Sequence, residues 1–257
     1  MRAVRLDQDY HVHATFCADA QSTLHENLRE AERQGLRTVC LVDYVSTSST
    51  YVPEHVTAVR ALRPTTNIEV LCGIETKMLD RAGHLDMPNL VSVDHVLIAD
   101  HHFPSETGPL SHGAVRSLLL DGAMLAREAV ECLVDASVAA MARVERPVMA
   151  HPFSLLPKIG LHESFVATSH LQHFARAARR HGALVEVNEK WSCPGPRLVA
   201  QLLRAGVHLV AGSDAHHHGS VGHYPRVREN LRGAHFPHDA AVATSSPTHR
   251  PFALAGH

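Results

Sequence analysis

The chain has 257 residues, and its 45% hydrophobic content is normal for a globular protein with a sizeable core. Its 24 Lys and Arg nearly balance its 26 Asp and Glu, which argues against partners such as nucleic acid or an anionic membrane surface. No apolar run approaches the roughly 18 residues that a membrane span needs. The five cysteines form no C-x-x-C pair, and the chain begins with no secretory pattern, so we expect a reducing, cytoplasmic setting.

The first half of the chain alternates apolar, strand-like runs with amphipathic, helix-like ones. Residues 4–12 predict a first strand. Residues 22–35 predict a helix, because Thr23 and Glu26 have the spacing of a capping box and Gly35 stands where a helix ends. Further strands are expected at residues 36–43, 67–75 and 93–100, and a further helix at 53–63.

The second half continues the alternation. Residues 112–145 look helical and are expected to divide into two helices near Asp121 and Gly122. The sequence from about residue 232 is rich in Pro, His, Ala and Ser, so we expect one domain over 1–232 and a loosely ordered tail over 233–257. The remaining strands are expected at 146–152, 183–188 and 207–214, and the remaining helices at 164–182 and 196–206.

About seven strands with helices between most of them predict βαβ units and a mostly parallel sheet, either a barrel or an open doubly wound sheet. In a parallel barrel all strand carboxyl ends lie on one face, where active sites form. Histidine is unusually common in this chain, with 23 residues, and several lie beside acidic residues at these strand ends. The strand ends concerned read HVH at 11–13, GIE at 73–75, DHH at 100–102, HP at 151–152 and DAH at 214–216.

The spacing within these strand ends indicates metal binding. Residues two apart on a strand point to the same side, as do His11 with His13 and Asp214 with His216. Nitrogen and carboxylate donors that converge at about 2.0–2.2 Å hold a divalent ion, and a set without cysteine suits Zn, Mn or Fe. A carboxylate such as Glu75 can bridge two ions, and ions about 3.5–4 Å apart suit displacement at phosphorus.

This ordered set resembles the PHP family, the polymerase and histidinol phosphatase domains, over about residues 8–230. The resemblance implies an α/β fold, a distorted TIM-like (β/α)7 barrel, with two or three metal ions at its carboxyl-terminal mouth. It also implies phosphoesterase activity, which here predicts a phosphoric monoester hydrolase. Carried over by position, the implied metal ligands are His11, His13, Asp19, Glu75, His102 (with His101 as the alternative), His151, Asp214 and His216.

Two positions depart from the commonest pattern of that family. Asp19 stands where some members have a third histidine, and aspartate can also bind a metal. Tyr44 ends a V-D-Y segment where most members read T-D-H, and tyrosine, with a pKa near 10, is a poor ligand at neutral pH. We therefore expect a firmly bound pair of ions and a weak or absent third ion.

The implied reaction uses a metal ion that lowers the pKa of bound water to about 7, so that hydroxide attacks phosphorus. Asp214 would bind the metal and orient the nucleophile, and His216 or His151 would protonate the leaving alcohol. Four side chains follow strand ends or lie in nearby loops and are expected to bind substrate, although ordinary solvated side chains would look the same in sequence: Lys158, Lys190, Arg226 and His84.

Three further side chains near predicted strand ends have two interpretations each. Glu186 and Asn188 lie two apart at the end of one strand, and they either support the ligands through hydrogen bonds or form an ordinary polar strand end. Trp191, the single tryptophan, forms either a wall of the mouth or part of the core.

The function that these features favour is a metal-dependent phosphatase acting on a small phosphomonoester. The oligomeric state is not predicted. A nuclease of the same chemistry is disfavoured by the near-neutral charge, because binding to a phosphate backbone requires Lys and Arg. The same cluster could hydrolyse a C–N or C–O bond, or perform redox chemistry with iron and Tyr44. A non-catalytic metal-binding module is disfavoured because the ligand set is nearly complete.

Overall fold

The computed structural model describes residues 4–16, 18–88 and 92–234, and its centre is a sheet of seven parallel strands. A separate antiparallel hairpin joins β5 (Phe103–Ser105) to β6 (Gly108–Leu110). In spatial order the seven strands are β1 (Gln8–His13), β2 (Thr38–Val42), β3 (Glu69–Lys77), β4 (His95–Ala99), β7 (Pro147–Met149), β8 (Leu184–Asn188) and β9 (His208–Gly212).

The two ends of this sheet meet and nearly close a barrel. Val12 forms a parallel bridge with Ala215, just beyond β9. The N–H of His13 donates to the carbonyl of Ala215 at 2.9 Å, and the N–H of Ala215 reaches the carbonyl of His11 at 3.3 Å. The α/β barrel expected from the resemblance is therefore confirmed, and the open doubly wound alternative is not.

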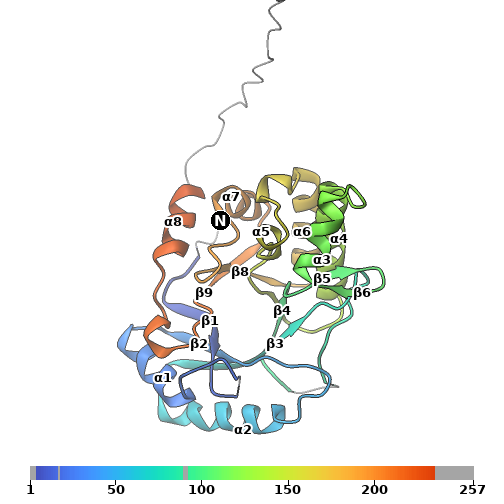
Figure 1. The fold of residues 1–257 in the computed structure, drawn as a ribbon. Helices are drawn as coiled ribbons and strands as arrows, with labels where there is room; N and C mark the ends of the chain where they lie inside the picture. The colour runs from blue at the N-terminus through green and yellow to red at the C-terminus, as the bar shows by residue number, and fades with distance from the viewer. Residues whose placement is uncertain (1–3, 17, 89–91, 235–257) are drawn as a thin grey trace, which may run out of the picture.

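The helices surround the strands (Figure 1). The capping box of Thr23 and Glu26 is present, since each residue's backbone N–H donates to the other's side chain. The long helical segment divides as expected, with Gly122 in the left-handed region between the two halves. The helices are α1 (Leu24–Arg33), α2 (Val52–Leu62), α3 (His112–Leu120), α4 (Ala126–Met141), α5 (Leu155–Lys158), α6 (Thr168–Arg180), α7 (Pro196–Arg204) and α8 (Pro225–Ala234), with 3-10 turns at Arg63–Thr65, Glu163–Phe165 and His218–Ser220.

Three elements were not expected from the sequence: the β5–β6 hairpin, the single-turn helix α5 and the helix α8. Helix α8 continues to Ala234, two residues past the expected domain boundary, and the rest of the expected tail lies outside the described residues. Within the described part of the chain, no helix combines the length and apolar character that crossing a bilayer requires.

Side chains fill the inside of the barrel. A large apolar cluster lies between the strands and the helices, and a smaller cluster consists of inward-pointing residues of the strands. The inner cluster contains Cys40, Val42, Leu97, Ala99, Val148, Ala150 and Val210. The strands are thereby packed on both sides, so the residues at their carboxyl ends are held on a rigid frame.

Candidate metal centre

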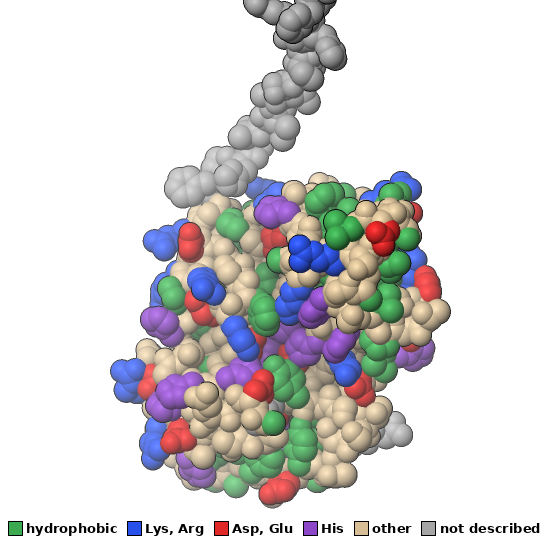
Figure 2. Space-filling view, viewed as in Figure 1, with side chains coloured by type: hydrophobic (Ala, Val, Ile, Leu, Met, Phe, Trp, Pro, Cys, Tyr) green, Lys and Arg blue, Asp and Glu red, His purple; other side chains and the backbone are tan. Residues whose placement is uncertain are grey.

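Two groups of metal-capable side chains lie at the carboxyl ends of the strands. The first group is His11, His13 and Asp214, and the second group is Glu75, His101 and His151. Within each group, one ligand atom per residue lies within 4.8 Å of the others, and all six side chains are buried except the half-buried His101. Figure 2 shows histidines gathered at the centre of this face of the molecule, bordered by Lys and Arg side chains.

Glu75 lies between the two groups and contacts both. Its Oε2 is 3.4 Å from His11 Nε2 and 3.2 Å from His13 Nε2, on the side of the first group. Its Oε1 is 3.1 Å from His151 Nε2 and 3.3 Å from His101 Nε2, within the second group. One carboxylate therefore presents one oxygen to each group, which is the arrangement of a bridging ligand.

The contacts of the first group fit a cation better than they fit hydrogen bonding. His11 Nε2 and His13 Nε2 face one another at 3.0 Å, and Asp214 Oδ1 lies 4.0 and 3.7 Å from these two nitrogens. Glu75 Oε2 is buried, and within the described residues no donor reaches it with hydrogen-bond geometry. Buried acceptors rarely lack a donor, so ring nitrogens and oxygens that converge in this way indicate ligands of a metal ion.

Buried carboxylates behind the groups fix the orientation of two imidazole rings. Glu186 Oε1 lies 3.0 Å from His11 Nδ1, and Glu186 Oε2 accepts the backbone N–H of His151 at 2.6 Å. Asp100 Oδ1 lies 3.3 Å from His151 Nδ1 and accepts the hydroxyl of Ser154 at 2.5 Å. Because a carboxylate only accepts, each Nδ1 carries its hydrogen, and each Nε2 is the nitrogen on which a metal would take the place of a proton.

Electrostatics keep these carboxylates ionised. Burial alone would raise the pKa of Glu75, but His11 and His101 hold the pKa well below its usual value. Burial alone would lower the pKa of His151, but hydrogen bonds to Asp100 and Glu75 raise the pKa to about 10. The carboxylates therefore attract positive charge strongly, as a site for divalent cations must.

The backbone is strained at two of these positions. His151 has a φ of 29° and Asp214 a φ of 54°, in the left-handed region that non-glycine residues rarely enter. Such conformations cost about 1–3 kcal/mol each and occur mainly at functional sites, where the surrounding structure holds them.

His216, Asp19 and Tyr44 form a third, looser arrangement beside the first group. His216 Nε2 lies 3.3 Å from Asp19 Oδ2 and 3.4 Å from the hydroxyl of Tyr44. The ring of His216 also lies 4.3 Å from that of His13, centre to centre. Tyr44 thus stands beside His216 where the family resemblance implies a histidine ligand, so this arrangement offers two good metal donors rather than three.

The two adjacent histidines after β4 differ in their contacts. His101, and not His102, reaches Glu75. The ring of His102 instead stacks on His112 at 6.2 Å, and burial lowers the pKa of His102, with Lys77 acting in the same direction. The backbone has left the strand at Ala99, so the strand's alternation no longer decides which of the two side chains points inward.

Both lysines that were expected to bind substrate lie beside Trp191 at the mouth. Lys190 Nζ is 3.4 Å from Asp214 Oδ1 and 3.3 Å from His216 Nδ1. Lys158 Nζ lies 3.8 Å from the centre of the Trp191 ring. Arg226 is exposed, and its guanidinium donates to the carbonyl of Lys190 at 3.0 Å. Lys158 and Lys190 therefore place positive charge next to the metal-capable groups.

His84 does not join this arrangement. Its Nδ1 lies 2.7 Å from Asp80 Oδ2, and its side chain lines a separate hollow together with Arg143 and Arg146. The loop that carries His84 turns back after β3, because Met78 and Leu85 form an antiparallel bridge. The expected contact between His84 and substrate is therefore not supported by its position.

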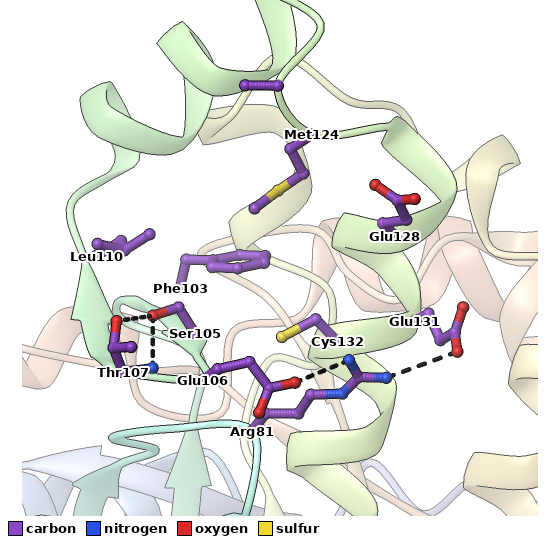
Figure 3. A pocket seen from close by; sticks show the side chains of 11 residues that line it. Arg81, Phe103, Ser105, Glu106, Thr107, Leu110, Met124, Glu128, Glu131 and Cys132 are labelled. Carbon is purple, nitrogen blue, oxygen red and sulfur yellow. Dashed lines mark hydrogen bonds and ion pairs between the residues drawn. The ribbon is translucent and has the colours of Figure 1, made fainter.

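Another hollow, of about 560 Å³, lies between the β5–β6 hairpin and α4 (Figure 3). Phe103 and Met124 form part of its apolar lining. Arg81 lies between Glu106 at 3.0 Å and Glu131 at 3.6 Å, so its charge is already balanced. None of the six residues of the two groups lines this hollow, which leaves the barrel mouth as the candidate site.

The comparison with protein families agrees with this geometry. A family model described as the PHP domain matches residues 9–190. The chain belongs to the PHP domain family. A relative of this PHP chain in Caldanaerobacter subterraneus subsp. tengcongensis, named "Probable phosphatase", is 24% identical over 263 residues, with 94% of this chain and 89% of the relative covered. Another "Probable phosphatase", from Edwardsiella ictaluri, is 28% identical over 249 residues, with 92% and 89% covered.

Solved structures share the fold of this PHP chain. The histidinol phosphate phosphatase of Lactococcus lactis subsp. lactis, solved with zinc, L-histidinol and phosphate, superposes with a TM-score of 0.61 at 16% identity, with 89% of this chain and 94% of the other covered. A structure from Listeria monocytogenes gives a TM-score of 0.63 at 12% identity, with 84% and 97% covered. At such low identity, these two likenesses show the fold and nothing more.

Proposed function

We propose that this PHP chain is a metal-dependent phosphatase that hydrolyses small phosphomonoesters. The position of Glu75 carries this proposal, because one buried carboxylate presents an oxygen to each of two His-containing groups. A site for two neighbouring cations follows from that geometry, and paired cations suit displacement at phosphorus. The family and the relatives named "Probable phosphatase" support the same activity.

The first and second groups would hold the metal pair, which we expect to be Zn, Mn or Fe. Asp19 and His216 would hold a weaker third ion. Bound metal ions lower the pKa of a coordinated water to about 7 and neutralise charge on phosphoryl oxygens. We propose His101 as a ligand in place of His102, which the family resemblance implied.

The chain's own residues would bind the phosphoryl group and manage protons. Lys190, beside Asp214 and His216, is placed to donate to phosphoryl oxygens, and Arg226 stands behind it through the carbonyl of Lys190. His216 is half-buried, whereas His151 is held between Asp100 and Glu75. When no third ion is bound, we therefore favour His216 over His151 as the group that protonates the leaving alcohol.

A small substrate suits the charge of the chain. The net charge of −2 does not favour binding to the phosphate backbone of a nucleic acid. The Lactococcus lactis structure contains L-histidinol and phosphate, which supports a small phosphorylated substrate of some kind for this chain too.

Phosphate release from p-nitrophenyl phosphate, measured with Zn or Mn added, tests the proposal. We expect activity that Glu75→Ala or Asp214→Ala lowers at least about a hundredfold, because loss of even a supporting residue behind a metal ligand costs about ten- to a hundredfold. Glu106→Ala, an exposed carboxylate at the separate hollow, is the matched control and should keep full activity. Metal-loaded protein that is inactive on a broad panel of phosphoesters would contradict the proposal and favour hydrolysis of C–N or C–O bonds, or iron redox chemistry.

A further inference from the structure

The lysines of this chain are confined to one end of the barrel. The sequence contains three lysines, and the other 21 of its 24 Lys and Arg residues are arginines. Lys77 is the last residue of β3, Lys158 ends the helix α5 that follows β7, and Lys190 follows β8. All three therefore lie towards the carboxyl ends of the strands, the end that carries the candidate metal centre.

Lys158 differs from the other two in its partners. Lys77 pairs with Asp86 at 3.1 Å, and Lys190 lies 3.4 Å from Asp214. Lys158 is half-buried, and no carboxylate within the described ranges lies at ion-pair distance from it. Its Nζ instead lies over the ring of Trp191. A cation held on an aromatic face keeps its charge and its N–H donors for an anion.

Trp191 is firmly placed, and it connects Lys158 to the metal-capable groups. Its Nε1–H donates to Asp214 Oδ2 at 2.9 Å, and its backbone N–H donates to the side chain of Asn188 at 2.8 Å. The indole is 39% exposed, so it forms part of the wall of the mouth. The charge of Lys158 is thus held one indole ring away from Asp214.

Carboxylates in the loops that follow β3 and β8 are already engaged. Asp86 pairs with Lys77, and Glu189 accepts the backbone N–H groups of Arg226 and Val227 at the start of α8. Asp19, which is exposed, pairs with His216 at 3.3 Å. An ammonium group on a substrate would therefore meet the like charges of Lys158 and Lys190 at this wall, whereas an anionic group would gain cationic partners.

We propose that Lys158 and Trp191 form an outer anion subsite, which selects phosphomonoesters whose leaving alcohol carries a second anionic group, a carboxylate or a phosphate. The subsite rests on the proposed phosphatase function and narrows its substrate class. It disfavours esters whose alcohol carries an ammonium group, such as the L-histidinol that the Lactococcus lactis enzyme holds.

Esters of similar size that differ in the second charge test this subsite. The values of kcat/KM are measured on the metal-loaded enzyme for 3-phosphoglycerate, propane-1,3-diol bisphosphate, glycerol 3-phosphate and O-phosphoethanolamine. We expect kcat/KM for one or both of the first two esters to exceed that for O-phosphoethanolamine at least about tenfold. The ester with the higher kcat/KM shows whether the subsite prefers a carboxylate or a phosphate. Lys158→Met should reduce this preference about tenfold, mainly through KM, whereas Lys77→Met, the same substitution at a paired lysine, should retain it.

Fluorescence of Trp191 gives a readout that does not depend on turnover, because it is the only tryptophan in the chain. Glycerate, the alcohol released from 3-phosphoglycerate, should change the emission with saturation in the wild type and in Lys77→Met, and the change should be lost in Lys158→Met. Ethanolamine should give no saturable change.

The two proposals can fail separately. Equal hydrolysis of all four esters, or a preference that Lys158→Met leaves unchanged, would overturn the subsite while the phosphatase function stands. Saturable binding of glycerate that depends on Lys158, in a protein that releases phosphate from none of the esters, would support the subsite and contradict the phosphatase function. An emission change that is equal for glycerate and ethanolamine would again overturn the subsite.

Discussion

Glu186 holds the imidazole of His11, with Glu186 Oε1 and His11 Nδ1 3.0 Å apart in the interior of the barrel mouth. The other oxygen of the same carboxylate accepts the backbone N–H of His151 at 2.6 Å. One side chain therefore orients a member of each metal-capable group. Glu186 is fully buried and also accepts from the side chain of Asn188. Of the two interpretations of the Glu186 and Asn188 pair, the structure favours support of the ligands.

Glu186→Gln should weaken metal binding. An amide presents one acceptor and one donor group, so it cannot accept from both His11 and His151 as the carboxylate does. We expect zinc affinity to fall about ten- to a hundredfold, as measured by competition with a chromophoric chelator. Glu189→Gln is the matched control. Glu189 lies three residues further along the chain, and it accepts backbone N–H groups at the start of α8 instead of supporting a histidine. Equal zinc affinity in the two variants would show that Glu186 has no supporting role.

Gly212 leaves room for the side chain of Glu186, which packs against this glycine beside His11. A Cβ at this position would overlap the carboxylate of Glu186 and lie 2.9 Å from the Cβ of His11. Gly212→Ala should therefore reduce the free energy of unfolding by about 1–3 kcal/mol, since overpacking displaces buried groups. Denaturant unfolding measures this change. Gly113→Ala, in α3 with open space around the added methyl, should be neutral or slightly stabilising. A Gly212→Ala protein as stable as the wild type would contradict the tight packing described above.

His101 and His102 should differ in their effect on metal content. His101 belongs to the second group with Glu75 and His151, whereas His102 stacks on His112. His101→Ala should lower bound zinc per chain, measured by elemental analysis after gel filtration, and His102→Ala should retain it. The opposite pattern would restore the assignment made from the sequence.

The sequence was sufficient to predict the barrel and that several metal-capable side chains meet at its mouth, because strands carry or precede these side chains. His11 and His13 lie within β1 and Glu75 within β3, where alternation fixes which side chains point inward. Parallel strands place their carboxyl ends on one face, so distant residues could be expected to meet.

The rest of the site depends on irregular backbone, which sequence patterns do not describe. His101 follows the end of β4, and His151 has a positive φ. Asp214 lies beyond the end of β9 with a positive φ, so the strand alternation from which we expected Asp214 and His216 to share a side does not apply there. His84 lies in a loop that turns back on β3. The pairing of Asp100 with His151 links residues 51 positions apart, and neither a motif nor a spacing indicates it.

The four cysteines in the described part of the chain should be unreactive in the native protein. Burial raises the pKa of Cys72 to about 12 and that of Cys132 to about 11, and it raises the pKa values of Cys40 and Cys193 well above their usual range. At pH 8 the thiolate fraction is therefore smaller than in a free cysteine, and the thiolate is the reactive form. In a Cys17→Ser variant, Ellman's reagent should modify almost no thiol before denaturation and four after it. Rapid modification of the native variant would contradict this burial.

Tyr44 should limit the number of tightly bound metal ions. Its hydroxyl lies 3.4 Å from His216 Nε2, where the family resemblance implies a third imidazole, and a neutral phenol is a weak ligand at pH 7. We expect two zinc ions per chain after gel filtration, measured by elemental analysis, and occupancy closer to three in Tyr44→His. His216→Ala should retain the pair, because His216 belongs to neither group, whereas Asp214→Ala should lose part of it. Three ions at full occupancy in the wild type would refute this account of Tyr44.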